Sequence, residues 1–307
     1  MEDGIYFNLD DELYHKENRL SSSGIRDILE SPSNFWFKSN FNPLKKEPKS
    51  DALKDGRIFH SMVLEGNNFH NKYKVMPLEI EGLSKNSNDF KLWSSTQTLE
   101  IIPYQKFKQF DLIIKYLSEK GQILYNNVFK DGYPEVSIFW TEDNIKRKAR
   151  IDYLKASSYN DLKTYIKTQK SPIDDYVKRY FFTYRVYIQM IYYDRALKNA
   201  VNLPVFGSSK QKDFWEKTKN NPRVPMVAFI NRELPQARIK VFSQEACPDL
   251  WRLGEKQISQ AEFLYLDYLD KYGEKRAWLE NVETENLLFK DEDFPQSFYE
   301  LLTGNII

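Results

Sequence analysis

The sequence predicts one α/β or α+β domain in which a mixed central sheet is flanked by helices. Three consecutive segments with the alternating pattern of strands occupy the middle of the chain, at 134–140, 146–154 and 159–166. Two more strand-like segments, 226–233 and 237–244, follow after a helical stretch. Because helical patterns precede, separate and follow these strands, we expect helices on both faces of the sheet.

The composition is that of an ordinary globular protein of 307 residues, with 41% hydrophobic and 15% aromatic residues. No apolar run approaches the roughly 18 residues of a membrane span, and the acidic opening "MEDGIYFNLDDELYH" is unlike a signal peptide. The single cysteine, Cys247, excludes an internal disulfide framework and a cysteine-bound zinc ion or iron–sulfur cluster. We therefore expect a cytoplasmic protein with no membrane partner.

The net charge of +1 conceals an uneven distribution of charge. Residues 277–307 contain seven acidic residues and one lysine, so the rest of the chain holds 44 basic and 37 acidic residues, a net charge of +7. We expect an acidic, aromatic tail there, after a single domain over 1–276. Within 143–170, eight basic residues accompany three acidic ones, which predicts a basic patch able to steer a polyanion. A solvated lysine-rich surface is the alternative interpretation.

The N-terminal region of the domain predicts a short helical segment. Within 20–37, Ser22 or Ser23 can cap the start of a helix, and Ser31-Pro32 is a signal that ends it. The polar stretch "FNPLKKEPKS" that follows predicts a loop.

Two further helices are predicted before the strands. One covers 51–66 and ends at Gly66, and the other covers 104–121 and ends at Gly121. The polar stretch 82–97 between them predicts a loop.

The second half of the chain predicts a turn and two helices. The residues "TEDN" suit a turn that joins the first two strands. Ser171-Pro172, an N-cap followed by a proline at the first helical position, predicts a long helix that runs to about Ala200. Residues 201–225 predict a loop, and 248–273 predict the final helix.

Two carboxylates and a lysine occur together on the second and third strands. Side chains alternate between the faces of a strand, so Asp161 and Lys163 share a face, and Asp152 on the neighbouring strand can point to the same side. Burying these charges together is costly unless a metal ion or an anion balances them. The pattern indicates a catalytic site for Mg²⁺, with Mn²⁺ as a substitute, because hard cations favour oxygen ligands. A surface hairpin with ion pairs is the alternative.

Three more residues could extend such a site. His60 lies one helical turn after Gly56, so the glycine leaves room for a substrate or a metal ion beside the imidazole. A packing glycine and a hydrogen-bonded core histidine explain the same residues. Glu135 opens the first strand and could reach the same pocket, although a glutamate at a strand end can also be solvated.

A polar column is predicted on the long helix after the strands. Arg185, Gln189 and Tyr193 are spaced i, i+4 and i+8, which places them on one side of that helix. A binding surface and an ordinary amphipathic stripe are both consistent with this spacing.

Several motifs together resemble a known family. "GRIFH", "PEVSIFW", "ARID", "DLKT" and "YIQMIYY", in this order and spacing, resemble the RecE-type exonucleases of the PD-(D/E)xK nuclease superfamily, which are related to the RecB nuclease domain and lambda exonuclease. The opening "LYHKENRLSSSGIRDILESPSNFWF" resembles the start of the same family, so the likeness runs from about Tyr14 to the final helix. One departure is "RAWLENVETE", which stands where related proteins carry a Gly-Trp-Pro-like stretch.

The resemblance implies the fold of that superfamily and a catalytic role for several residues. His60 corresponds to a metal ligand or near-ligand, and Lys163 to the catalytic lysine. Asp152 and Asp161 correspond to the metal-binding aspartates, with the Leu162 carbonyl as a further ligand. The superfamily more often has glutamate at the position of Asp161, but RecE-like members accept aspartate. Glu135 completes the candidate catalytic set.

The resemblance also implies contacts with DNA. Its Q-x-x-x-Y helix corresponds to Gln189 and Tyr193, to which we add Arg185 and Arg150 as candidate DNA contacts. A pocket for the 5′-phosphate is expected on the first predicted helix, although a capped surface helix explains the same residues. Its candidate residues are Ser22, Ser23 and Arg26.

The activity implied by this resemblance is Mg²⁺-dependent, 5′→3′ digestion of linear double-stranded DNA, which leaves 5′-phosphate products and 3′ overhangs for recombination by strand annealing. The implied partners are double-stranded DNA ends, further copies of the chain in a toroidal homo-oligomer, and a single-strand annealing protein. Two alternatives stay open. One is a structure-specific or restriction-type endonuclease of the same fold, and the other is a non-catalytic DNA-binding or scaffold protein.

Overall fold

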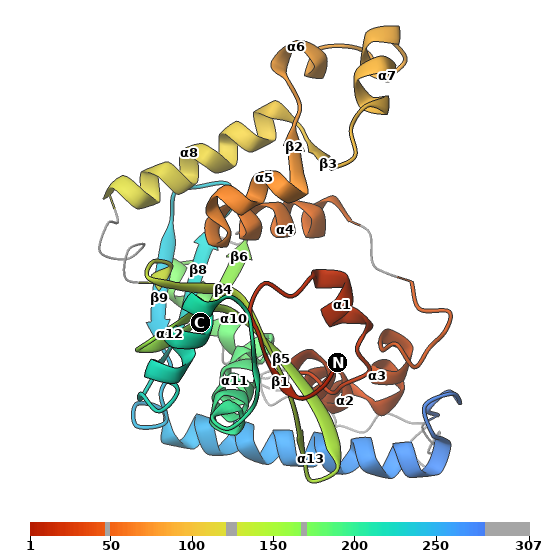
Figure 1. Cartoon of the computed structure of the whole chain (residues 1–307), viewed down its shortest axis with the longest axis vertical. Coiled ribbons are helices and arrows are strands. Elements are labelled where there is room, and N and C mark those ends of the chain that lie inside the picture. The colour runs from red at the N-terminus through yellow and green to blue at the C-terminus, as the bar shows by residue number, and fades with distance from the viewer. Residues whose placement is uncertain (47–49, 121–127, 167–170, 280–307) are drawn as a thin grey trace, which may run out of the picture.

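A seven-stranded mixed sheet forms the centre of the computed structural model, which describes residues 1–46, 50–120, 128–166 and 171–279 (Figure 1). The strand order is β7-β1-β4-β5-β6-β8-β9. Antiparallel pairs join β1 to β4, β4 to β5, and β5 to β6. β6 pairs parallel with β8, and β1 pairs parallel with β7. The bounds are β1 Gly4–Tyr6, β4 Gly132–Glu142, β5 Ile145–Lys155, β6 Ser158–Tyr165, β7 Val205–Phe206, β8 Val224–Asn231 and β9 Ala237–Val241. The predicted mixed sheet and its five strand segments are confirmed.

Helices cover both faces of this sheet, as predicted (Figure 1). The helices that contribute most to the core and the site are α2 Ser22–Glu30, α4 Asp51–Leu64, α8 Tyr104–Lys120, α10 Ile173–Thr183, α11 Val186–Ala200 and α13 Pro248–Tyr272. The shorter ones are α1 Asp11–Lys16, α3 Pro32–Lys38, α5 Phe69–Lys72, α6 Leu78–Glu81, α7 Asn88–Ser95 and α12 Ser209–Thr218. Gly121, the predicted end of α8, lies outside the described residues.

The side chains of β6 alternate between the two faces of the sheet, so they contact a different helix on each face. Leu162 packs with Phe59 of α4 in one buried cluster. Asp161 and Lys163 point the opposite way, where both bond to Gln189 of α11. The charged residues of β6 are therefore enclosed between the sheet and α11.

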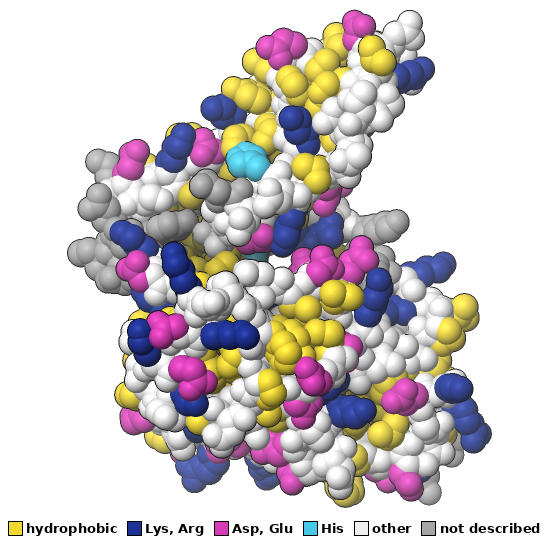
Figure 2. All heavy atoms as spheres, in the orientation of Figure 1, with side chains coloured by type: hydrophobic (Ala, Val, Ile, Leu, Met, Phe, Trp, Pro, Cys, Tyr) yellow, Lys and Arg dark blue, Asp and Glu magenta, His cyan; other side chains and the backbone are white. Residues whose placement is uncertain are grey.

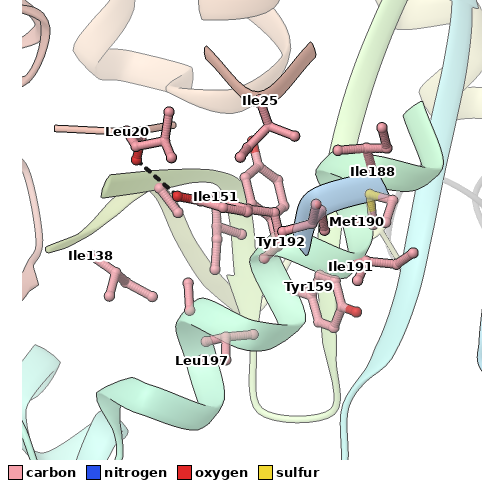
Figure 3. Close-up of a cluster of buried hydrophobic side chains, with 14 of the residues drawn as sticks. Leu20, Ile25, Ile138, Ile151, Tyr159, Ile188, Met190, Ile191, Tyr192 and Leu197 are labelled. Atoms are coloured by element: carbon pink, nitrogen blue, oxygen red, sulfur yellow. Dashed lines mark hydrogen bonds between the residues drawn. The ribbon is translucent and has the colours of Figure 1, made fainter. Parts of the chain in front are cut away.

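The main hydrophobic core lies between the sheet and α11, and the side chains of both interdigitate there (Figure 3). Ile188, Met190 and Tyr192 of α11 are fully buried. The Tyr192 hydroxyl donates to the Leu20 carbonyl over 2.8 Å, so it ties α11 to the segment that leads into α2. Burial on nearly every side fixes the position of α11 against the strands.

The β4–β5 hairpin is closed by the predicted "TEDN" turn. Glu142 pairs with Ile145, so only Asp143 and Asn144 form the loop. Both have positive φ, 49° and 61°, as a two-residue type I′ turn requires, and Asp and Asn tolerate this conformation better than most residues.

The N-terminal segment 20–37 holds two helices where the sequence predicted one. Ser31 ends α2 and also caps α3, because its hydroxyl accepts from the Asn34 amide. Pro32 therefore starts a helix instead of only stopping one. The cap of α2 is Ser21, which accepts from the Gly24 amide, and not Ser22 or Ser23.

Two of the predicted loops contain regular structure. Within 82–97, Ser87 caps α7 by accepting from the Phe90 amide. Within 201–225, β7 and α12 form, and Ser208 and Gln211 make a reciprocal capping box at the start of α12. Polar composition predicted loops here, but the polar side chains satisfy the free amides of helix ends.

The predicted long helix after the strands is broken into two. α10 ends at Thr183, and α11 begins at Val186. Arg185 between them has φ 49°, in the left-handed region. At the start of α10, Pro172 occupies the N-cap position without a side-chain hydrogen bond, so the predicted Ser171 cap is wrong.

Two peripheral regions complete the description. α6, α7 and the β2–β3 pair (Tyr73–Val75 and Glu100–Ile102) form an arm that projects from the rest (Figure 1). At the other end, Trp278 lies inside the predicted acidic tail, yet it is fully buried in the main core. The tail beyond it, 280–307, lies outside the described residues. Among the described helices, none is long and apolar enough to cross a membrane.

Candidate active site

The candidate site lies where β5 and β6 separate. These strands pair only at Tyr153↔Asn160 and Leu154↔Tyr159, and then diverge. Asp152 lies in the gap between the diverging strands, which we call the fork. Its Oδ2 accepts a hydrogen bond from the Leu162 amide over 2.7 Å, in place of a β5 carbonyl. The two backbone groups of one strand residue point to the same edge, so the Leu162 carbonyl also faces the fork. A buried carboxylate thus takes over a backbone hydrogen bond of the sheet.

Glu135 lies across β4–β5 from Asp152, at a break in the ladder. Pro134↔Tyr153 and Val136↔Ile151 are paired, but Glu135 has φ 54°. A non-glycine residue in this region is uncommon and costs of order 1–2 kcal/mol. The distorted backbone accompanies a carboxylate that lies 3.4 Å from His60 Nδ1. Glu135 therefore belongs to the pocket, where burial, the largest effect, raises its pKa.

His60 lies between these two carboxylates. Its Nε2 is 3.0 Å from Asp152 Oδ2, and its side chain is 27% exposed. Burial favours the neutral imidazole, but Asp152 and Glu135 outweigh it and raise the pKa of His60 to about 10. A protonated imidazole has no free lone pair for a metal ion. In this structure His60 orients Asp152, and its role as a metal ligand stays a prediction.

Lys163, Asp161 and Gln189 form a closed hydrogen-bonded set. Lys163 Nζ donates to Asp161 Oδ1 over 2.9 Å and to Gln189 Oε1 over 3.0 Å. Gln189 Nε2 donates to the same Asp161 oxygen over 2.8 Å and to the Tyr193 hydroxyl over 2.6 Å. Gln189 and Tyr193 were predicted to lie beside DNA. Here they are buried and hold the lysine and the aspartate in place.

The two aspartates have opposite electrostatic environments. Both are desolvated by burial, which raises the pKa of a carboxyl. For Asp152 the adjacent His60 and the Leu162 amide outweigh burial, so its pKa is lowered. For Asp161 burial dominates over the Lys163 ammonium, and the nearby Asp152 adds to it, so its pKa is raised. Carboxyl groups whose pKa values are pushed apart are typical of catalytic sites.

The oxygen atoms at the fork suit a hard metal cation. Asp161 Oδ2 is buried and accepts no hydrogen bond in the described structure, although the Lys163 ammonium lies 2.7 Å away. The Asp161 carboxylate, the Asp152 carboxylate and the Leu162 carbonyl are oxygen ligands of the kind that Mg²⁺ prefers. Among the described residues, no three His, Cys, Asp or Glu side chains are already arranged as a metal cluster. Any such site would need the backbone carbonyl or water as well.

Arg150, one of the predicted DNA contacts, does not lie on an open surface. Arg150 has a side chain that is 9% exposed, bonds to Asp11 and stacks over the Tyr14 ring at 4.3 Å. Its neighbour Arg147 is fully buried against Glu262. The predicted basic patch is therefore largely internal at β5, where these arginines bind protein groups. Lys167 and Lys170, from the same run, lie outside the described residues.

Arg185 also departs from its predicted place. It lies before the first turn of α11 and not on a common stripe with Gln189 and Tyr193, because the left-handed backbone breaks the helix there. Its half-buried side chain makes no hydrogen bond within the described chain. The predicted i, i+4, i+8 column is therefore reduced to Gln189 and Tyr193.

The three residues predicted for a phosphate pocket separate. Ser23 lines a cavity of about 150 Å³ at the start of α2, together with Ser21, Lys38 and Lys148. Ser22 is buried, and Arg26 donates to the Tyr184 carbonyl over 3.0 Å. The structure thus brings one of the three to the cavity.

Lys148 is a residue of this cavity that the sequence did not single out. It is 7% exposed and donates to the carbonyls of Tyr14 and Glu17, each over 2.9 Å. Burial, with Lys45 nearby, lowers its pKa to about 8. Its place on the strand that carries Asp152 was visible in the sequence, but its burial came from the packing of α1.

A wide groove lies between α1 and the first turns of α4. Its volume is about 1,320 Å³, and its walls carry Lys16, Lys54 and Arg57 as well as Asp11 and Asp51. Figure 2 shows acidic and basic side chains close together in this region. Asp11 binds Arg150, whose Nε is 4.0 Å from Glu135, so the groove adjoins the site.

Comparison with known proteins finds a solved structure with a similar fold. No model of a known protein family matches this sequence, and no curated protein matches it. The crystal structure of a "Putative exonuclease" from Eubacterium rectale is similar over 97% of this chain and 99% of that chain, with a TM-score of 0.50 and 16% identity. At this identity the likeness is one of fold alone. The chain therefore has the mixed α/β fold of that protein, which confirms the predicted fold class.

Proposed function

We propose that this chain is a metal-dependent nuclease that hydrolyses phosphodiester bonds of DNA. The observation that carries the proposal is the fork of β5 and β6, where Asp152, Asp161 and Lys163 converge. A structural ion pair would need one acid for the lysine. The fork holds a second buried carboxylate, that of Asp152, and the Leu162 carbonyl faces the same place.

The roles of the residues follow from their contacts. Asp152, Asp161 and the Leu162 carbonyl would hold Mg²⁺ or Mn²⁺, which when bound supplies a Lewis acid at the phosphoryl oxygen. Lys163 keeps an ammonium at the fork, where it can stabilise negative charge that develops on the phosphate. Gln189 fixes the direction of that ammonium, and His60 with Glu135 fixes the Asp152 carboxylate.

Exonuclease action is the specific form of this proposal. Two observations support it: the family that the motifs resemble, and the name of the protein from Eubacterium rectale with the same fold. In this proposal the substrate is a linear duplex end, digested 5′→3′ to leave 3′ overhangs. The groove between α1 and α4 would admit DNA, and the cavity at Ser23 would hold the terminal phosphate. A toroidal homo-oligomer and an annealing protein as partner belong to the same proposal.

Digestion of linear and closed circular duplex DNA tests the proposal directly. We expect loss of the linear form alone, in Mg²⁺ and not in EDTA, and no loss with Lys163→Ala. Lys198→Ala is the matched control, because Lys198 is an exposed lysine of α11 that pairs with Asp194. End-labelled strands report polarity, since 5′→3′ digestion releases a 5′ label first.

The other outcomes of this digestion experiment would each favour one of the two alternative functions. Cutting of the closed circle would indicate an endonuclease of the same fold. Absence of metal-dependent cleavage of either form, with DNA binding retained, would favour a binding or scaffold protein.

A further inference from the structure

Arg232 is a buried arginine held at the end of β8. Its backbone amide donates to the Tyr165 carbonyl over 3.0 Å, and its Nη1 donates to the Ala52 carbonyl, in the first turn of α4, over 2.7 Å. Asn231 before it accepts two amides of the following turn. The guanidinium is therefore fixed between β6, β8 and α4.

Among the described residues, no acid pairs with Arg232. It is 8% exposed, and in the part of the chain that the structure describes it pairs with no carboxylate, while its Nε makes no hydrogen bond. Arg147, the other buried arginine among these residues, is paired with Glu262 at 2.8 Å. A guanidinium stays protonated, so burial without an anion is unfavourable. The contrast indicates that Arg232 is suited to an anion from outside the chain.

Gly56 and Thr164 leave space beside this guanidinium. A methyl group on Gly56 would lie 3.5 Å from Arg232 Nη1 and 3.8 Å from Thr164 Oγ1. Both are ordinary van der Waals distances, so alanine would fit, and alanine favours a helix interior more than glycine does. Packing therefore does not require the glycine. The half-buried Thr164 hydroxyl makes no hydrogen bond within the described structure.

The three residues border the candidate active site. Thr164 follows Lys163 directly on β6, and Gly56 lies one turn before His60 on α4, about 6 Å along the helix axis. A guanidinium, a hydroxyl without a hydrogen bond and a glycine backbone are groups that suit a phosphate. Arginine binds a phosphate through two parallel hydrogen bonds, and glycine permits close approach.

We propose that Gly56, Thr164 and Arg232 bind a backbone phosphate of the nucleic-acid strand being hydrolysed, next to the one at the fork. This inference rests on the proposed nuclease function and adds a positioning site to it. The phosphate completes the charge balance of Arg232, so the strand is held on the α4 side while Lys163 acts from the α11 side.

The affinity of the Lys163→Ala protein for linear duplex DNA, measured in EDTA at several salt concentrations, tests the site. In this background we expect Arg232→Gln to weaken binding about tenfold and to reduce the salt slope by about one charge. Arg223→Gln is the matched control. Arg223 lies at the opposite end of β8 and also bonds only to carbonyls and a hydroxyl, so its loss should change neither quantity.

Gly56→Ala supplies a second readout that does not depend on the folding of the arginine variant. We expect weaker binding together with an equal or higher melting temperature, because the methyl group favours the helix but covers the phosphate site. Full binding by Gly56→Ala with an unchanged salt slope for Arg232→Gln would overturn the inference and leave the nuclease proposal standing. Failure of the Lys163→Ala parent to bind any DNA would overturn both.

Discussion

Gln189 shows how a single side chain can join Lys163, the candidate catalytic lysine, to Asp161. Its amide accepts from Lys163 and donates to Asp161, so both charged groups share one neutral partner. An amide suits this place because it offers an acceptor and two donors without adding charge. The sequence placed Gln189 on the correct helix, but only the packing of α11 on β6 shows that it faces the lysine.

Replacing Gln189 tests that positioning role. Gln189→Ala should lower kcat for DNA hydrolysis by about 10²-fold with little change in KM, because a displaced ammonium loses its alignment with the phosphate. Gln257→Ala, on α13, is the control, since Gln257 bonds to Tyr187 away from the fork. A raised KM at constant kcat would instead indicate a direct DNA contact.

Lys148 makes a testable contribution to the pH dependence of stability. Its pKa of about 8 in the folded state lies below the ordinary 10.5, so the unfolded chain binds more protons between these values, and stability should rise with pH across this window. Urea unfolding of the wild type and Lys148→Met isolates the effect. From pH 7 to pH 10.5 the wild type should gain on the order of 3 kcal/mol relative to the variant. A constant difference would refute the perturbed lysine.

At the scale of elements, the break between α10 and α11 concentrates strain in one residue. Arg185→Gly should raise the free energy of unfolding by roughly 1 kcal/mol relative to Arg185→Ala, because only glycine adopts φ 49° without cost. Denaturant unfolding of the pair measures this difference. Equal stability of the two variants would mean that the helices can rejoin. Equal loss of DNA affinity in both would assign the missing side chain a contact with DNA.

Most elements could be predicted because their patterns are local. The five strand segments, the two-residue turn at Asp143-Asn144 and helix α13 follow from alternation, turn residues and helical periodicity. Several of the errors occurred where polar residues cap helices. Ser31 both ends and begins a helix, and the Ser208–Gln211 capping box lies in a stretch whose composition resembles a loop.

The candidate site was predictable in its residues but not in its contacts. Asp152, Asp161 and Lys163 do converge, as strand alternation allows. Three other features depend on tertiary packing, which local periodicity does not predict. They are the divergence of β5 from β6, the positive φ of Glu135 and the pairing of His60 with two carboxylates. Arg232 escaped notice because its burial is set by α4, 180 residues earlier in the chain.

For the molecule as a whole, the site should oppose stability. Burial raises the pKa of Asp161, so its charged form destabilises the folded chain at neutral pH. In EDTA, Asp161→Asn should therefore unfold at a higher temperature than the wild type. Excess Mg²⁺ should reverse the order, since a cation that binds the folded state only adds about 2.7 kcal/mol at 100 times its Kd. Calorimetry with both proteins measures this; a Mg²⁺ shift of equal size in each would exclude Asp161 as a ligand.

The parallel pairing of β6 with β8 also bears on the order in which the chain folds. The β4–β5 hairpin joins neighbours through a two-residue loop, whereas Ser158 must find Val224 across the length of α10, α11 and α12. Contacts between distant parts of a chain form slowly. In pulsed hydrogen exchange, the amides of β4 and β5 should become protected before those of β8. The local β5–β6 hairpin would bring Asp152 and Asp161 together early, and β8 would cover the other edge of β6 last. On a ribosome the sheet around the charged fork would be completed only after synthesis has passed Asn231.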